Sequence, residues 1–290
     1  MTNTARCRVA VWCSLALAAL AAPALAQGRE PPEISIELVD PKVLRVCADP
    51  HNLPFSNDKG EGLENKLAEL FGAKLDKKVA YTFFPQATGF VRMTLGSHRC
   101  DVIMGFPQGD DLVQGTNPYY RTAYALIYKA GGDLEGLDRL SDERLKQKRI
   151  GVVAGTPPAT YLAANALLAR ARPYALVIDT RIDSSAEAMI RDLKQGEIDV
   201  GLLWGPMAGY FAREDKAIRV VPLLKDSGGP RLSYRIGMGV RSADQNWKRQ
   251  LNRLIQENQA EINKILIAFG VPLLDEKDQP ITAESLDRKP

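Results

Sequence analysis

The chain has 290 residues, with 38 basic and 35 acidic side chains and a net charge of +3. This near balance argues against a basic surface for nucleic acid or for an anionic membrane. The length suits one large domain or two lobes of ordinary size.

The first 26 residues have the features of a secretory signal peptide. Arg6 and Arg8 form a basic start, an apolar run follows, and small residues precede a cleavage site after Ala26. The apolar run is too short to span a membrane, and no cysteine stands at the cleavage site to carry a lipid. We therefore expect a soluble periplasmic protein without a membrane anchor. Its mature form keeps 36 basic and 35 acidic residues, a net charge of +1.

The next part of the chain alternates between strand and helix patterns. Residues 27–42 form a lead-in arm that contains Pro and Glu. Short apolar runs then predict strands at 43–49, 78–85 and 100–106, and the pattern predicts helices at 63–75 and from residue 89 to near Gly96. A long strand is predicted at 122–130. This order favours a parallel sheet with helices on both faces.

The alternation begins again after a polar stretch rich in Gly and Asp. It predicts strands at 149–155, 174–180, 198–204 and 234–240, helices at 156–171 and 184–197, and a helical pair at 244–269. We expect an α/β fold of two lobes joined by two crossover strands. Lobe 1 would hold residues 43–124 plus 235–274, lobe 2 residues 125–234, and residues 275–290 would be a mobile tail.

Ligands of open α/β sheets bind beyond the carboxyl ends of the strands. The loops after Cys47, Met104, Gly155 and Leu203 are therefore the candidates for a cleft. Packing in the core explains Trp204 equally well, and capping of a helix explains Thr156. The candidate residues for binding a ligand or partner are Asp49, His51, Asn52, Phe55, Phe90, Phe106, Tyr120, Thr156 and Trp204.

The segment CADPHNLPFSN, residues 47–57, raises the question of catalysis or metal binding. Catalysis would need Cys47 and His51 within hydrogen-bonding reach. A metal site would need His98 and Cys100 as well, but parallel strands would place these two at the opposite edge of the sheet. We predict no catalytic residue, no metal and no cofactor. A disulfide between Cys47 and Cys100 stays open, because export favours it and an offset of about 10 Å between paired strands opposes it.

The order of elements resembles the bilobal periplasmic solute-binding proteins of the polar-amino-acid type. The motifs that carry this resemblance are LRVCADPHNLPFSN, CDVIMG, NPYYRTAYALIY, RIGVVAGT and GEIDVGLLWGPMAGYF. In that family an Arg after the third strand holds the substrate carboxylate, and an Asp ending a later strand holds the ammonium. Here residues 106–113 contain no Arg, and Trp204 occupies the place of the Asp. The resemblance thus implies the two-lobed fold without the ionic contacts that hold an amino acid.

Finer details resemble the MxaJ and XoxJ type of protein, which is associated with quinoprotein methanol dehydrogenase. The phrases are ADPHNLPFSN, FPQATGFVRMTL, CDVIMGFP, TPPATYL, WGPMAGYFA and IAFGVP. They imply a monomeric, chaperone-like accessory protein that binds the dehydrogenase, alone or with its cytochrome c, to assist maturation or activation. A peptide segment or a small ligand would fill the cleft. The alternatives are an importer receptor for a weakly polar small molecule and, third, an enzyme such as a dehydratase, with Asp49 as its cleft carboxylate.

Overall fold

The computed structural model describes residues 37–180 and 182–287. The predicted signal peptide and most of the lead-in arm lie outside the described residues. The first parallel strands form as expected: β1 (Val43–Ala48) lies between β4 (Lys78–Phe83) and β5 (Val102–Pro107). Helix α1 (Leu63–Lys74) packs on these strands through apolar residues at helical spacing, which include Leu63, Leu67 and Phe71.

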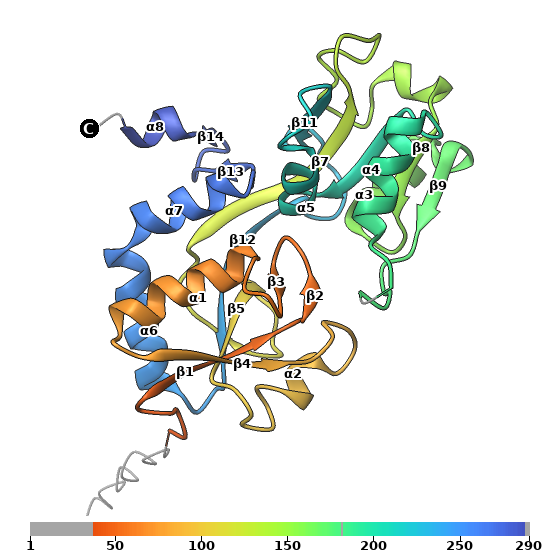
Figure 1. Cartoon of the computed structure of the whole chain (residues 1–290). Helices are drawn as coiled ribbons and strands as arrows, with labels where there is room; N and C mark the ends of the chain where they lie inside the picture. Colours follow the sequence, from red (N-terminus) through yellow and green to blue (C-terminus); the bar gives the residue numbers. More distant parts are fainter. Residues whose placement is uncertain (1–36, 181, 288–290) are drawn as a thin grey trace, which may run out of the picture. The chain divides into compact units, whose positions relative to one another are not determined.

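Two long strands connect the first part of the sheet to the second, as Figure 1 shows. They are β7 (Tyr120–Lys129) and β12 (Ser233–Val240), which pair antiparallel where Ser233 faces Ala123. Strand β12 also pairs with β5, and the end of β7 pairs with β10 (Val200–Trp204) and β11 (Ile218–Pro222). The crossover strands expected from the sequence are therefore present.

The second part of the sheet is again parallel at its centre. Strand β8 (Ile150–Val153) lies between β10 and β9 (Ala171–Tyr174). Helices α3 (Pro157–Ala164), α4 (Ser185–Gln195) and α5 (Gly205–Ala212) follow the strands. Helix α4 begins with Ser184, whose hydroxyl accepts the backbone N–H of Glu187, and it ends at Gly196 in the left-handed conformation that glycine favours.

Several predicted elements were wrong in extent. The strand expected at 174–180 is absent, because the parallel neighbour of β8 is β9, which ends at Tyr174. The helix expected at 156–171 is α3, which ends at Ala164. A short 3₁₀ turn, Leu168–Arg170, follows it. The helix expected to run from residue 89 to near Gly96 is reduced to α2 (Phe90–Met93). The remaining short elements are β2 (His51–Asn52), β3 (Ser56–Asn57), β6 (Gln114–Gly115) and a 3₁₀ helix at Glu143–Gln147.

Buried apolar residues gather in separate clusters on the two parts of the sheet. One cluster joins β1, β5 and α1 to the C-terminal helices α6 (Gln245–Glu257) and α7 (Gln259–Ala268). Others fill the space around β8, β10, α3 and α4. The division into two lobes with the boundaries given above stays a prediction.

The chain after residue 274 has some structure of its own. Strand β13 (Leu273–Leu274) pairs with β14 (Pro280–Ile281), and α8 (Ala283–Asp287) follows. The guanidinium of Arg121 lies 2.6 Å from a carboxylate oxygen of Asp278. The mobility expected for residues 275–290 stays a prediction. Within 37–180 and 182–287, no helix combines the length and the apolar character that a membrane span requires.

Candidate functional site

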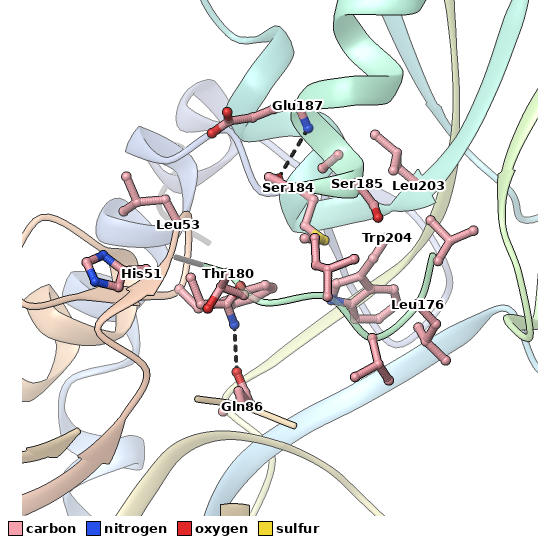
Figure 2. Close-up of a pocket in the computed structure, with 18 of the residues that line it drawn as sticks. His51, Leu53, Gln86, Leu176, Thr180, Ser184, Ser185, Glu187, Leu203 and Trp204 are labelled. Carbon is pink, nitrogen blue, oxygen red and sulfur yellow. Dashed lines mark hydrogen bonds between the residues drawn. The ribbon is translucent and has the colours of Figure 1, made fainter. Parts of the chain in front are cut away.

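A cavity of about 970 Å³ opens at the carboxyl ends of β1 and β10 and beside the crossover strands. Its walls come from residues 51–59, from β7, β10 and β12, from the loop residues 175–180 and 182–184, and from the first turn of α4. Figure 2 shows His51 and Leu53 on one side of this pocket and Ser184 and Trp204 on another. The volume lies at the upper end of the range for small-molecule sites, so the pocket has room for more than a free amino acid.

The pocket brings together most of the predicted binding residues. Those that line it are His51, Asn52, Phe55, Tyr120, Thr156 and Trp204. Phe90 and Phe106 do not line it, which corrects the expectation for both. On β5 neighbouring side chains point to opposite faces, so Gly105 lines the pocket while Phe106 packs with Phe90 on the other face. The roles of the lining residues stay predictions.

Asp49 supports the pocket from behind and does not line it. Its side chain is buried, and its carboxylate accepts the backbone N–H groups of His51 at 2.9 Å and Gln86 at 2.6 Å. The Thr180 hydroxyl lies 3.3 Å from the same carboxylate and connects the loop segment 175–180 to it. Asp49 therefore fixes the loop that carries His51 and Asn52, whose side chain donates to Gln86 at 2.7 Å.

Cys47 and Cys100 are joined in a disulfide, which settles the question that the sequence left open. Strand β5 begins only at Val102, and Cys47 pairs with Ile103, so Cys100 lies in the turn before the strand. The turn brings the two Cα atoms to 5.4 Å instead of the offset expected for residues inside both strands. Neither sulfur is a free thiol, and no cluster of metal-ligating side chains exists among residues 37–180 and 182–287.

Trp204 stands at the centre of an aromatic cluster, which we define as Tyr124, Trp204 and Tyr234. The Trp204 ring lies 5.1 Å from the ring of Tyr124 and 5.7 Å from that of Tyr234, both edge-on. Trp204 pairs directly with Tyr124 across β10 and β7, and this register places their rings on one face. Burial raises the pKa of Tyr124 to about 12, so its ring keeps a neutral hydroxyl. Sequence reasoning missed both tyrosines, although each lies on a predicted strand.

Sequence reasoning also missed Glu64, the most perturbed acid in the pocket wall. Its side chain is only 7% exposed, and burial, followed by the charge of Asp49, raises its pKa to about 8. Within the described chain, no group donates a hydrogen bond to its carboxyl and no cation pairs with it. Gly105 leaves room for it, because a Cβ there would lie 2.3 Å from a carboxyl oxygen. The only sequence signal was an acid in the first turn of α1.

The described loop residues before α4, 175–180 and 182–184, present apolar side chains at the edge of the pocket. Leu176, Val177 and Ile182 are 58%, 65% and 83% exposed, and all of them line the cavity. Thr156 lies nearby at the start of α3, where its hydroxyl donates to the carbonyl of Val153 at 2.6 Å. Thr156 therefore stands at the N-cap position of α3, but its side chain makes no capping hydrogen bond to the helix.

The comparisons with known proteins agree with this geometry. No family model matches the chain. It is 32% identical to the protein MoxJ of Methylorubrum extorquens over 94% of this chain and 96% of that protein. It is 27% identical to the MoxJ protein of Paracoccus denitrificans, covering 82% of this chain and 91% of that protein.

Solved structures of similar proteins give the same result. The crystal structure of the periplasmic binding protein XoxJ from Methylobacterium extorquens AM1 matches with a TM-score of 0.70 and 42% identity, over 81% of this chain and all of that one. MxaJ from Methlophaga aminisulfidivorans MPT matches with a TM-score of 0.70 and 25% identity, over 80% of this chain and all of that one. An ancestral cationic amino acid solute-binding protein, at 21% identity, shares the fold alone, with a TM-score of 0.63 over 79% of this chain and 95% of that one. The chain belongs to the MoxJ, MxaJ and XoxJ family of bilobal periplasmic binding proteins.

Proposed function

We propose that this chain is a periplasmic accessory protein of methanol oxidation. It binds a quinoprotein methanol dehydrogenase, or a segment of it, and so assists maturation or activation of that enzyme. The observation that carries the proposal is the relationship to MoxJ over nearly the whole length of both chains. Export to the periplasm follows from the predicted signal peptide and fits XoxJ, which is described as a periplasmic binding protein.

The chemistry of the pocket supports a role other than capture of an amino acid. Trp204 ends β10 within an aromatic cluster, where an amino-acid receptor would carry an acid for the ligand's ammonium. Residues 106–113, after β5, contain no Arg to hold a carboxylate. Among the described lining residues the basic side chains are Lys59 and Arg191. A bidentate ion pair is a major source of affinity for zwitterions, so we expect free amino acids to bind weakly.

The apolar rim supports a macromolecular partner. Leu176, Val177 and Ile182 each expose more than half of their surface, and all three line the pocket. Contiguous exposed apolar side chains mark protein-binding surfaces more often than they mark bare solvent-facing loops. A partner segment that enters the cavity would cover them, whereas a small ligand buried within the cavity would leave them exposed.

A cross-linked pull-down of the tagged mature protein from its own periplasm, analysed by mass spectrometry, tests the proposal. We expect a quinoprotein methanol dehydrogenase as the main captured protein, with its cytochrome c at a lower level. The double variant Leu176→Asp/Val177→Asp should lose this capture. The matched control is Leu112→Asp, because Leu112 is 69% exposed but lies outside the pocket. Capture of a membrane permease without a dehydrogenase would favour the importer receptor instead.

The relatives also support a role in binding rather than in catalysis, because XoxJ is described as a periplasmic binding protein. Asp49, the candidate acid for a dehydratase, does not suit catalysis because its oxygens accept backbone N–H groups behind the pocket. Glu64 lines the pocket with a pKa raised to about 8 and is the acid that such catalysis would use, so incubation of the protein with candidate hydroxy or amino acids tests this role, and we expect no product.

A further inference from the structure

We propose that the pocket is built to bind an organic cation, with its ammonium or guanidinium head at Glu64 and its apolar stem along the aromatic cluster. The cation is either a free amine or the side chain of Lys or Arg in a protein segment. Only the second case depends on the function proposed above.

Glu64 provides an acceptor that has no partner of its own. The side chain is more than nine-tenths buried, yet it lines the cavity, and no described residue donates to its carboxyl or forms an ion pair with it. Its carboxyl reaches the cavity, so the hydrogen bond that no described residue supplies must come from water or from a ligand there. Position 105 is Gly, and a Cβ there would take the space of the carboxyl. The Glu64 carboxyl therefore points to the cavity without a protein partner, and a bound cation would supply that partner.

The aromatic cluster continues from this acid along the crossover strands. Ile236 lies beside Gly105. A Cβ atom built on Gly105 would lie 4.0 Å from the Ile236 side chain and 2.3 Å from the Glu64 carboxyl. Tyr234 precedes Ile236 by two residues on β12, so their side chains share one face, and Trp204 and Tyr124 extend that surface. Aromatic faces attract cations and also pack well against alkyl chains.

The charges around the pocket favour a positive ligand. The acidic side chains in its described lining are Asp58, Glu64, Asp183 and Glu187, and the basic ones are Lys59 and Arg191, with His51 as a further titratable group. Glu64 interacts electrostatically with Asp49, Tyr81, Tyr119 and Tyr120, and none of them carries a positive charge. Of these four only Tyr120 lines the pocket, so a cation at Glu64 meets that acid and a neutral hydroxyl.

Binding of a cation at Glu64 should release a proton. Burial raises the pKa of the Glu64 carboxyl to about 8, so at pH 7 this carboxyl is protonated in most molecules of the free protein. The carboxyl must ionise to pair with the ligand, which makes the affinity depend on pH. The affinity for an ammonium ligand should rise about tenfold between pH 6 and pH 7 and level off above pH 8.

Isothermal titration calorimetry with matched probes tests this inference. The probes are butylammonium and the peptide acetyl-Leu-Lys-Leu-amide, each compared with a neutral analogue, butanol or the norleucine peptide. Titrations at pH 7 in buffers of different ionisation enthalpy count the protons released. We expect each charged probe to bind at least about tenfold tighter than its analogue and to release close to one proton. Binding of butylammonium identifies free amines as sufficient, and binding of the peptide alone identifies a protein segment.

Two variants connect the result to the named residues. Glu64→Gln should abolish both the preference for the charged probe and the proton release, provided its circular dichroism is unchanged. Trp204→Leu should keep the proton release but weaken binding by about tenfold, because it removes the central ring. Equal binding of charged and neutral probes, proton release that persists in Glu64→Gln, or no binding of either charged probe at millimolar concentration would overturn the inference. None of these measurements involves the dehydrogenase, so failure here leaves the pull-down result intact.

Discussion

The substitution Glu64→Gln should stabilise the protein, and the gain should grow with pH. The carboxyl has a pKa of about 8 in the folded protein against an ordinary value of 4.5. A raised pKa means that the folded state holds the proton more tightly, so this favourable contribution is complete below pH 4.5 and is lost as pH rises toward 8. Glutamine cannot ionise and escapes this loss.

The size of the effect follows from the same two pKa values. Because the unfolded chain releases the Glu64 proton more readily than the folded protein does, this residue reduces the free energy of unfolding by about 2 kcal/mol at pH 6 and by about 5 kcal/mol at pH 9, relative to low pH. The difference in stability between Glu64→Gln and the parent should therefore grow by about 3 kcal/mol over this interval. Any constant effect of the buried amide cancels, because only the change with pH is compared.

Urea unfolding at pH 6, 7, 8 and 9 measures this difference, with the midpoint and slope fitted for each protein. The control is Glu69→Gln, which changes an exposed acid on the same helix whose partner is Lys66. Its stability difference should stay nearly constant with pH, as expected for a surface pair. A flat difference for Glu64→Gln as well would refute the reasoning, since the carboxyl would then be solvated or paired in the folded protein.

Further predictions concern the disulfide, the aromatic cluster and the glycine beside Glu64. Replacing Cys47 and Cys100 together with Ala should lower the free energy of unfolding by about 4 kcal/mol, because the bond closes a loop across 53 residues; an unchanged urea midpoint would contradict this. Trp204→Asp should weaken binding to the dehydrogenase while circular dichroism stays native, and loss of folding would make Trp204 a core residue instead. Gly105→Ala should destabilise by about 1–3 kcal/mol, and by clearly less in a Glu64→Ala background, since the clash is with that carboxyl; equal costs in both backgrounds would exclude the contact.

The sequence predicted the order of most large elements because hydrophobic periodicity and caps agree along much of the chain. The helix that Ser184 and Gly196 delimit is an example, since both end signals formed as expected. Residues 174–180 show the limit. They are apolar and rich in β-formers, but the sheet position beside β8 is already taken by Ala171–Tyr174, so they became the rim of the pocket. Local pattern cannot decide which of two neighbouring segments pairs with a strand.

Only part of the candidate site could be predicted, because some of its residues follow strands in the sequence and others depend on contacts made in the fold. The rule that ligands bind at the loops after strands pointed to His51, Asn52 and Trp204, which line the pocket, while their roles stay predictions. Glu64 could not be found in this way, because an acid in the first turn of a helix is usually exposed and its burial depends on contact with β5. The disulfide also depended on a turn that the sequence does not reveal, since Cys100 precedes its strand by two residues.

The central claim is that this protein binds a quinoprotein methanol dehydrogenase. The most direct test is a binding titration of the purified mature protein against the purified dehydrogenase of the same organism, by biolayer interferometry. The account predicts saturable binding that the Leu176→Asp/Val177→Asp variant weakens at least about tenfold and that Leu112→Asp leaves unchanged. Absence of saturable binding to the dehydrogenase, with and without its cytochrome c, would contradict the account.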